Sequence, residues 1–221
     1  IYQIVIGFEI ILFALLFIGV YKYQRNWKPV YPLFYTNGEL IKIGHRGAPA
    51  LAHENTLASF AKAVETGMNG VELDVQYSAD KQLVVFHDWD LKTLNGSDKI
   101  IEKMPYSEIE KISLHDDDNN KIPLFREVLN VLSKKCIIVV EIKSVHFLNA
   151  GIEKNVLEIV KEFNFEENCI ISSFNPLILW RIRKLNPNIL TAFLWSKTDP
   201  QFSLNSPLWA WLCRPDAFHA D

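Results

Sequence analysis

Charged and imidazole side chains gather at the ends of several short apolar segments of this chain. They are His45 and Arg46, Glu72 and Asp74, His87 and Asp88, and Glu141 and Lys143. A polar group in a strand is costly to bury without a partner, so its position is informative. Side chains alternate along a strand, so Glu72 and Asp74 face one side together, and Glu141 and Lys143 do the same.

Three of these groups are carboxylates that would repel one another if they converged: Glu72, Asp74 and Glu141. A hard divalent cation with oxygen ligands removes that repulsion, and both Mg²⁺ and Ca²⁺ suit such a site. An ion held there can polarise a phosphoryl oxygen and stabilise negative charge while a phosphodiester is attacked. The acids therefore predict a cation site, without choosing between the two ions.

The remaining groups fit the other tasks of phosphodiester cleavage. His45 and His87 could share the proton transfers, one taking a proton from the nucleophile and one protonating the leaving alkoxide. Arg46 and Lys143 could hold the phosphate oxygens, the first as a fork and the second as a point charge. Single residues have simpler readings: Asp88 alone would suit a turn, and Glu54 with Asn55 would suit the cap of the following helix.

Apolar strands alternate with amphipathic helices, which favours a parallel sheet covered by helices. Six or seven strands in this order predict an α/β fold, a (β/α)₈ TIM barrel lacking its last unit. A doubly wound open sheet is the rival, but no glycine-rich phosphate loop follows the first strand. The carboxyl ends of barrel strands form one mouth, where the polar groups would meet. We expect strands at 40–44, 70–75, 83–87, 137–142, 169–172, 189–194 and 217–221, and helices at 55–66, 124–133, 151–163 and 176–185.

The N-terminal segment is almost entirely apolar and is followed by aromatic and cationic residues, which predicts a transmembrane helix over residues 1–23. Residues 24–39 contain Pro29 and Pro32 and are expected to be a linker. Residues 40–221 would form the barrel domain, incomplete at its C-terminus, since we expect a fragment at both ends. These features predict a single-pass membrane protein whose catalytic domain faces the cytoplasm.

Composition narrows the classes of partner. The 221 residues include 23 lysines and arginines against 26 aspartates and glutamates, a net charge of −3. No strong positive field draws such a chain to nucleic acid. Its three cysteines form neither a disulfide framework nor a zinc-binding pattern.

Several motifs occur together in one order along the chain. They are Ile43-Gly44-His45-Arg46-Gly47, Glu54-Asn55-Thr56, Gly70-Val71-Glu72-Leu73-Asp74-Val75, Val84-Val85-Phe86-His87-Asp88 and Glu141-Ile142-Lys143. Over about residues 41–195 the sequence resembles the glycerophosphodiester phosphodiesterase domain. The resemblance implies a (β/α)₈ barrel with a small insertion after the third strand, here about residues 89–121.

The same resemblance implies roles for individual residues. His45 and His87 would be the acid/base pair, Arg46 and Lys143 phosphate contacts, and Glu72, Asp74 and Glu141 the ligands of one divalent cation. The implied reaction hydrolyses a glycerophosphodiester to glycerol 3-phosphate and an alcohol. Two alternatives stay open: a lysophospholipase D acting on membrane lysophospholipids, and a non-catalytic membrane-tethered barrel that binds a partner.

Overall fold

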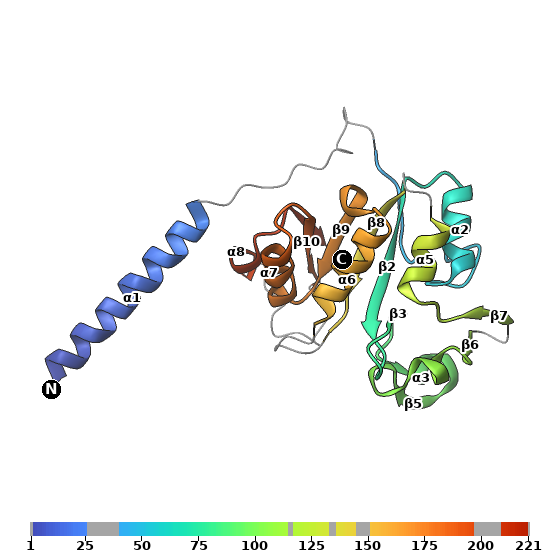
Figure 1. The fold of residues 1–221 in the computed structure, drawn as a ribbon, viewed down its shortest axis with the longest axis horizontal. Coiled ribbons are helices and arrows are strands. Elements are labelled where there is room, and N and C mark those ends of the chain that lie inside the picture. Colours follow the sequence, from blue (N-terminus) through green and yellow to red (C-terminus); the bar gives the residue numbers. More distant parts are fainter. Residues whose placement is uncertain are drawn as a thin grey trace.

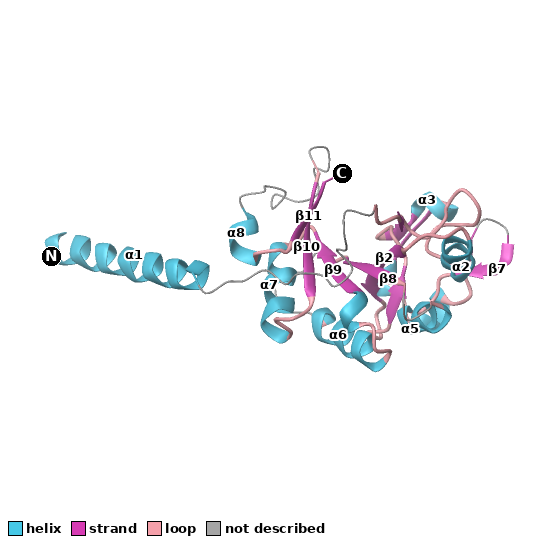
Figure 2. Cartoon of the chain, turned by 90° about the horizontal axis from the view of Figure 1, so that it is seen from above, coloured by secondary structure: helices cyan, strands magenta, loops and turns pink. Residues whose placement is uncertain are grey.

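The fold is built on one curved sheet, seen in the computed structural model of the chain (Figures 1 and 2). The structure describes residues 2–25, 40–114, 117–132, 136–144, 151–196 and 209–220. The order of the strands is β1-β2-β8-β9-β10-β11, all pairing in parallel, with β3 added against β2. Their bounds are β1 Ile43–Gly44, β2 Gly70–Tyr77, β3 Leu83–Val85, β8 Ile137–Ile142, β9 Cys169–Ser173, β10 Leu190–Trp195 and β11 Ala217–Ala220.

The third strand departs from the parallel arrangement that strand–helix alternation predicts. β3 pairs antiparallel with β2, with Val75 opposite Val85 and Tyr77 opposite Leu83. Only residues 78–82 join the two strands, and a parallel return needs a crossover of a dozen residues or more. The chain therefore folds back as a hairpin, and His87-Asp88 reaches the sheet edge after this reversal.

Four helices carry the apolar surface that covers the sheet. α2 (Leu57–Glu65), α5 (Phe125–Val131), α6 (Ile152–Glu162) and α7 (Pro176–Leu185) agree with the predicted helices to within three residues at each end. Figure 2 shows α5, α6 and α7 along one side of the sheet. Two short elements complete this region, η2 (Glu166–Asn168) and α8 (Ala210–Cys213). Buried faces of these helices form a core with alternate residues of the strands, among them Leu73, Val75, Ile138 and Val140.

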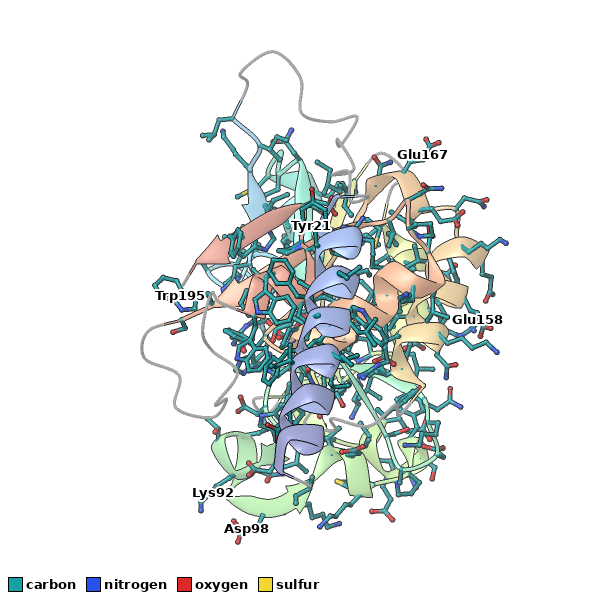
Figure 3. All side chains as sticks on the ribbon, turned by 90° about the vertical axis from the view of Figure 1, so that its left-hand side faces the viewer. Tyr21, Lys92, Asp98, Glu158, Glu167 and Trp195 are labelled. Carbon is teal, nitrogen blue, oxygen red and sulfur yellow. The ribbon has the colours of Figure 1, made fainter. Side chains whose placement is uncertain are left out.

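The predicted insertion after the third strand forms a small unit of its own. It contains β4 (Asp90–Leu91), α3 (Lys92–Asn95), β5 (Ser97–Ile100), η1 (Ile101–Lys103), α4 (Tyr106–Ile109), β6 (Ser113–Leu114) and β7 (Asp117–Lys121). Lys92 and Asp98 form an exposed ion pair on its outer side, 3.6 Å between Nζ and Oδ1 (Figure 3). Val84 and Phe86 pack into a second apolar core with residues of the insertion, including Ile101 and Ile109.

The N-terminal helix α1 spans Tyr2–Arg25, and side chains are described for Gly7 and residues 9–21. A membrane-spanning helix needs about 20 consecutive apolar residues. Across the described residues, no helix is both long enough and apolar enough to cross a membrane. The prediction of a transmembrane segment at 1–23, and with it of a single-pass membrane protein, is therefore wrong. Most of the predicted linker, residues 26–39, lies outside the described residues.

Candidate active site

Three carboxylates meet at the carboxyl end of the central strands. Glu72, Asp74 and Glu141 each offer one oxygen, and these oxygens lie within 4.8 Å of one another. Asp74 and Glu141 are register partners on the paired strands β2 and β8, which places their side chains next to each other. Glu72 lies two residues before Asp74 and so shares its face. The sheet register brings together the three acids that the sequence singles out.

The electrostatics of this cluster favour a bound cation. Burial and then the charge of Asp74 raise the pKa of Glu72 to about 8. Burial likewise raises the pKa of Glu141 to about 7, against the opposing effect of Lys143. Oδ1 of Asp74 is buried and accepts no hydrogen bond within the described part of the chain. Buried, converging carboxylate oxygens are the donor set that hard divalent ions prefer.

Arg46 links the first strand to the acid cluster. Its backbone N–H donates to Oε2 of Glu72 over 3.0 Å, and its guanidinium Nη1 donates to Oε1 of Glu54 over 2.8 Å. Its Nε lies 3.5 Å from Oδ2 of Asp74. The backbone contact holds the turn against Glu72, and the two side-chain contacts hold the guanidinium at the edge of the cluster.

The turn after β1 makes these contacts possible. Arg46 has a φ of 53° and Gly47 one of 90°, so two successive residues are left-handed. A Cβ on Gly47 would lie 2.4 Å from Oγ of Ser59, which is closer than real Cβ atoms approach. The Ser59 hydroxyl donates to the carbonyl of Arg46 and accepts from the N–H of Ala48, which clamps the turn onto α2. A residue without a side chain is required at position 47.

The Glu54-Asn55-Thr56 segment serves the site as well as the helix. Thr56 is the N-cap of α2, accepting from the N–H of Ser59 over 3.1 Å, so the reading of Glu54 and Asn55 as cap residues is wrong. Glu54 instead pairs with Arg46. Nδ2 of Asn55 donates to Oδ2 of Asp74 over 2.9 Å.

The two histidines lie on different supports. Nε2 of His45 lies 3.9 Å from Oε2 of Glu72, and its side chain is 73% exposed at the mouth of the site. Partial loss of hydration, and then the Arg46 guanidinium, lower the pKa of His45. Nδ1 of His87 lies 2.7 Å from Oδ1 of Asp88. A carboxylate only accepts, so Nδ1 donates in that bond and Nε2 is the other ring nitrogen.

Gln76 and Lys143 complete the supports of the site. Nε2 of Gln76 donates to the carbonyls of Phe86 and Asp88, each over 2.8 Å, and so holds the backbone on both sides of His87. Nζ of Lys143 lies 3.7 Å from Oε1 of Glu141 and 3.8 Å from Oδ1 of Asp74. The positively charged ammonium group of Lys143 thus lies between Glu141 and Asp74, two of the three acids.

A cavity of about 630 Å³ joins these groups. Six of the seven predicted site residues line it, and the seventh, Asp74, is almost fully buried within the acid cluster. Sequence reasoning did not single out two further lining residues, Ser172 on β9 and His219 on β11. Ser172 ends the predicted strand 169–172, so the strand-end argument that selected Glu141 could also have found it. His219 lies in the middle of the predicted strand 217–221 and gives no such signal.

A half-barrel of parallel strands with an acidic cluster at its carboxyl edge defines an α/β-barrel protein with a candidate cation site. The chain belongs to the glycerophosphoryl diester phosphodiesterase family, whose model matches residues 45–219. It is 36% identical over 161 residues to a glycerophosphodiester phosphodiesterase of Caldanaerobacter subterraneus subsp. tengcongensis, covering 70% of this chain and 66% of the relative. It is 30% identical over 162 residues to a human lysophospholipase D, covering 68% of this chain and 50% of that protein.

The chain is also similar to a solved structure of a phosphodiesterase. A phosphodiesterase of Oleispira antarctica, in complex with the product sn-glycerol-3-phosphate, is 27% identical, with a TM-score of 0.69. The likeness covers 82% of this chain and 74% of that one. The chain thus spans about two thirds of the bacterial relative's length and half of the human one's.

Proposed function

We propose that the protein is a metal-dependent phosphodiesterase that hydrolyses glycerophosphodiesters to glycerol 3-phosphate and an alcohol. The observation that carries the proposal is one cavity lined by acids, two histidines and two cationic side chains. Family membership supports the same reaction, as does the product bound in the Oleispira antarctica enzyme. These similarities also support the assignment of the sheet to a (β/α)₈ barrel.

Glu72, Asp74 and Glu141 would hold one divalent cation, Mg²⁺ or Ca²⁺. The buried Oδ1 of Asp74, which accepts no hydrogen bond within the described residues, and the raised pKa values of the two glutamates support this assignment. When bound, the ion supplies electrophilic stabilisation of the phosphoryl oxygens. Asn55 and Lys143 orient the acids through the contacts described above.

The proton transfers fall to the two histidines. His45, whose lowered pKa keeps it neutral near pH 7, is suited to accept a proton from the attacking oxygen. His87, fixed by Asp88 and presenting Nε2, is suited to donate a proton to the leaving alkoxide. Arg46 and Lys143 would contact the non-bridging phosphate oxygens, which accept hydrogen bonds and carry negative charge.

A second candidate keeps this chemistry and changes the substrate. Similarity to the human lysophospholipase D favours a lysophospholipid, whose phosphodiester is the same as that of a glycerophosphodiester. The two readings differ in whether the glycerol carries an acyl chain. Parallel assays with soluble glycerophosphocholine and micellar lysophosphatidylcholine separate them.

The test is release of glycerol 3-phosphate from glycerophosphocholine by the purified full-length protein. We expect no release in chelator and full release after Mg²⁺ or Ca²⁺ is restored. Release of choline from lysophosphatidylcholine alone would favour the second candidate. A folded protein that binds the cation but turns over neither substrate would contradict both, and one that binds no cation would support the non-catalytic alternative.

A further inference from the structure

The cavity is divided by charge into two halves. Its charged lining groups come from the first three strands of the sheet order and from the segment after β3, and they surround the acid cluster. The opposite wall, formed by β9, β10, β11 and the start of α7, is uncharged. Its lining residues are Ser172, Ser173, Phe174, Asn175, Leu194 and His219. A ligand spanning the cavity would meet ionic groups at one end and neutral groups at the other.

Two polar residues of this wall already serve the fold. The Ser173 hydroxyl donates to the carbonyl of Ile142 over 2.9 Å. Oδ1 of Asn175 accepts from the N–H of Leu177 over 3.0 Å and caps α7. Neither group needs a ligand to be satisfied.

Ser172 is different. Its side chain is 1% exposed, yet its Oγ forms no hydrogen bond in the part of the chain that the structure describes. Ser172 is the register partner of Glu141 on the neighbouring strand, so the two side chains lie next to each other on the inner face. A buried hydroxyl without a partner is unfavourable, and here it faces the cavity beside a proposed cation ligand.

His219 continues the same wall towards the mouth. Ser172 pairs with Ala192, and Ala192 pairs with Ala217, so all three share one face. His219 lies two residues beyond Ala217, on that face and one step nearer the carboxyl edge. It is half-buried, and burial lowers its pKa, so the ring is neutral near pH 7 and can both donate and accept.

We propose that Ser172 and His219 form a subsite for the hydroxyl groups of the substrate's glycerol. Phosphate oxygens only accept hydrogen bonds, so they are matched by Arg46 and Lys143, which are donors on the charged half of the cavity. Glycerol hydroxyls donate and accept, which matches a serine hydroxyl and a neutral imidazole. The inference rests on the proposed function and adds to it the residues that distinguish a glycerol ester from other phosphates.

Binding of two probes tests the subsite without relying on turnover. Isothermal titration of the Mg²⁺-loaded full-length protein would compare sn-glycerol 3-phosphate with inorganic phosphate. We expect Ser172→Ala and His219→Phe each to weaken glycerol 3-phosphate about three- to tenfold, the loss of one hydrogen bond, and to leave phosphate binding unchanged. Ser172→Thr, which keeps the hydroxyl, should retain the affinity. Ser97→Ala, in the insertion strand β5, is the matched control and should change neither affinity.

Melting temperatures and turnover of glycerophosphocholine distinguish a loss of the subsite from a loss of the fold or of the proposed function. Because the Ser172 hydroxyl has no partner, Ser172→Ala should not lower the melting temperature of the ligand-free protein. Unchanged affinity for glycerol 3-phosphate in both variants, or an equal loss for both probes, would overturn the subsite. So would a parent protein that binds glycerol 3-phosphate no more tightly than phosphate. Failure of the parent to hydrolyse glycerophosphocholine, with selective binding intact, would instead count against the proposed function.

Discussion

The amide of Asn55 holds the carboxylate of Asp74: Nδ2 donates to Oδ2 over 2.9 Å, and both side chains are almost fully buried. This bond ties the loop before α2 to the acid on β2. It engages one carboxylate oxygen and leaves Oδ1 without a hydrogen bond among the described residues, 3.8 Å from Nζ of Lys143. The Glu-Asn-Thr motif and the Glu-x-Asp motif are therefore two parts of a single site.

Asn55→Gly should weaken divalent cation binding about 10- to 100-fold, because the orienting bond to Asp74 is lost. Glycine suits position 55, where φ is 56°, whereas alanine would add backbone strain. Calorimetric titration with Mg²⁺ or Ca²⁺ measures the change. Asn95→Ala, at the exposed end of α3, is the control, and equal affinity in the two variants would contradict the orienting role.

Glu72→Ala should abolish turnover and cation affinity while the domain stays folded. The substitution removes one of three converging carboxylates, and it also relieves a repulsion that raises the pKa of Glu72. Cation titration and circular dichroism check the two expectations. Glu167→Ala, on the outer surface (Figure 3), should behave as the parent protein does. Normal turnover in Glu72→Ala would exclude the proposed cation site.

The cation-free protein should lose stability as the pH rises. The pKa values of Glu72 and Glu141 are raised from 4.5 to about 8 and about 7, so between those limits the folded state binds more protons than the unfolded chain. The free energy of unfolding therefore falls as pH rises through this window. Melting temperatures in chelator from about pH 5 to pH 8 should decline, and saturating Mg²⁺ should flatten the decline.

The matched variant for this pH dependence is Glu72→Gln, which cannot titrate at that position. Its melting temperature should vary less with pH than that of the parent protein in chelator. A melting temperature that rises from about pH 5 to pH 8 in chelator would show that the acids are ionised in the absence of the cation.

His87→Ala should lower kcat about 10²- to 10⁴-fold, the usual contribution of a positioned acid or base, with cation affinity unchanged. The reason is that His87 is held by Asp88 and lies outside the carboxylate cluster. Single-turnover kinetics and cation titration of the same preparation check both parts. A parallel loss of cation binding would assign His87 to the ligand set instead.

Gly47→Ala should destabilise the fold by roughly 1–3 kcal/mol, since it combines backbone strain at φ +90° with a clash on Ser59. Gly96→Ala is a matched control, because Gly96 has a φ of +75° but no atom within 4 Å of a new Cβ. Urea unfolding of both variants separates strain from clash. Equal losses would show that the turn can move away from α2.

The candidate residues that lie on the sheet itself could be predicted from the alternation of side chains along strands. Glu72, Asp74 and Glu141 converge because β2 and β8 are neighbours in register. Alternating strands and helices predict that these acids share one end of the sheet, but not this adjacency, since the predicted strand at 83–87 would lie between the two. The same reasoning did not foresee the reversal of β3, which depends on the short link at 78–82. It also could not show that Asn55 and Glu54 reach across to Asp74 and Arg46, because those contacts depend on a left-handed turn. The length and apolarity of the N-terminal segment led to the prediction of a transmembrane helix. That prediction was wrong, because no helix within the described residues meets the requirement for a membrane span.

Because β3 folds back as a hairpin, the residues of the candidate site are supported by two different apolar cores. The acids stand on strands of the main core, whereas His87 follows Val84 and Phe86, which pack into the small core of the insertion. Local opening of the small core would therefore loosen one support of His87, the proposed proton donor, while the hydrogen bonds from Gln76 on β2 and the carboxylate cluster stay in place. If the proposed function holds, variation inside the insertion would change the rate of catalysis more than cation binding, and this unit is the place to exchange in order to re-engineer the rate alone.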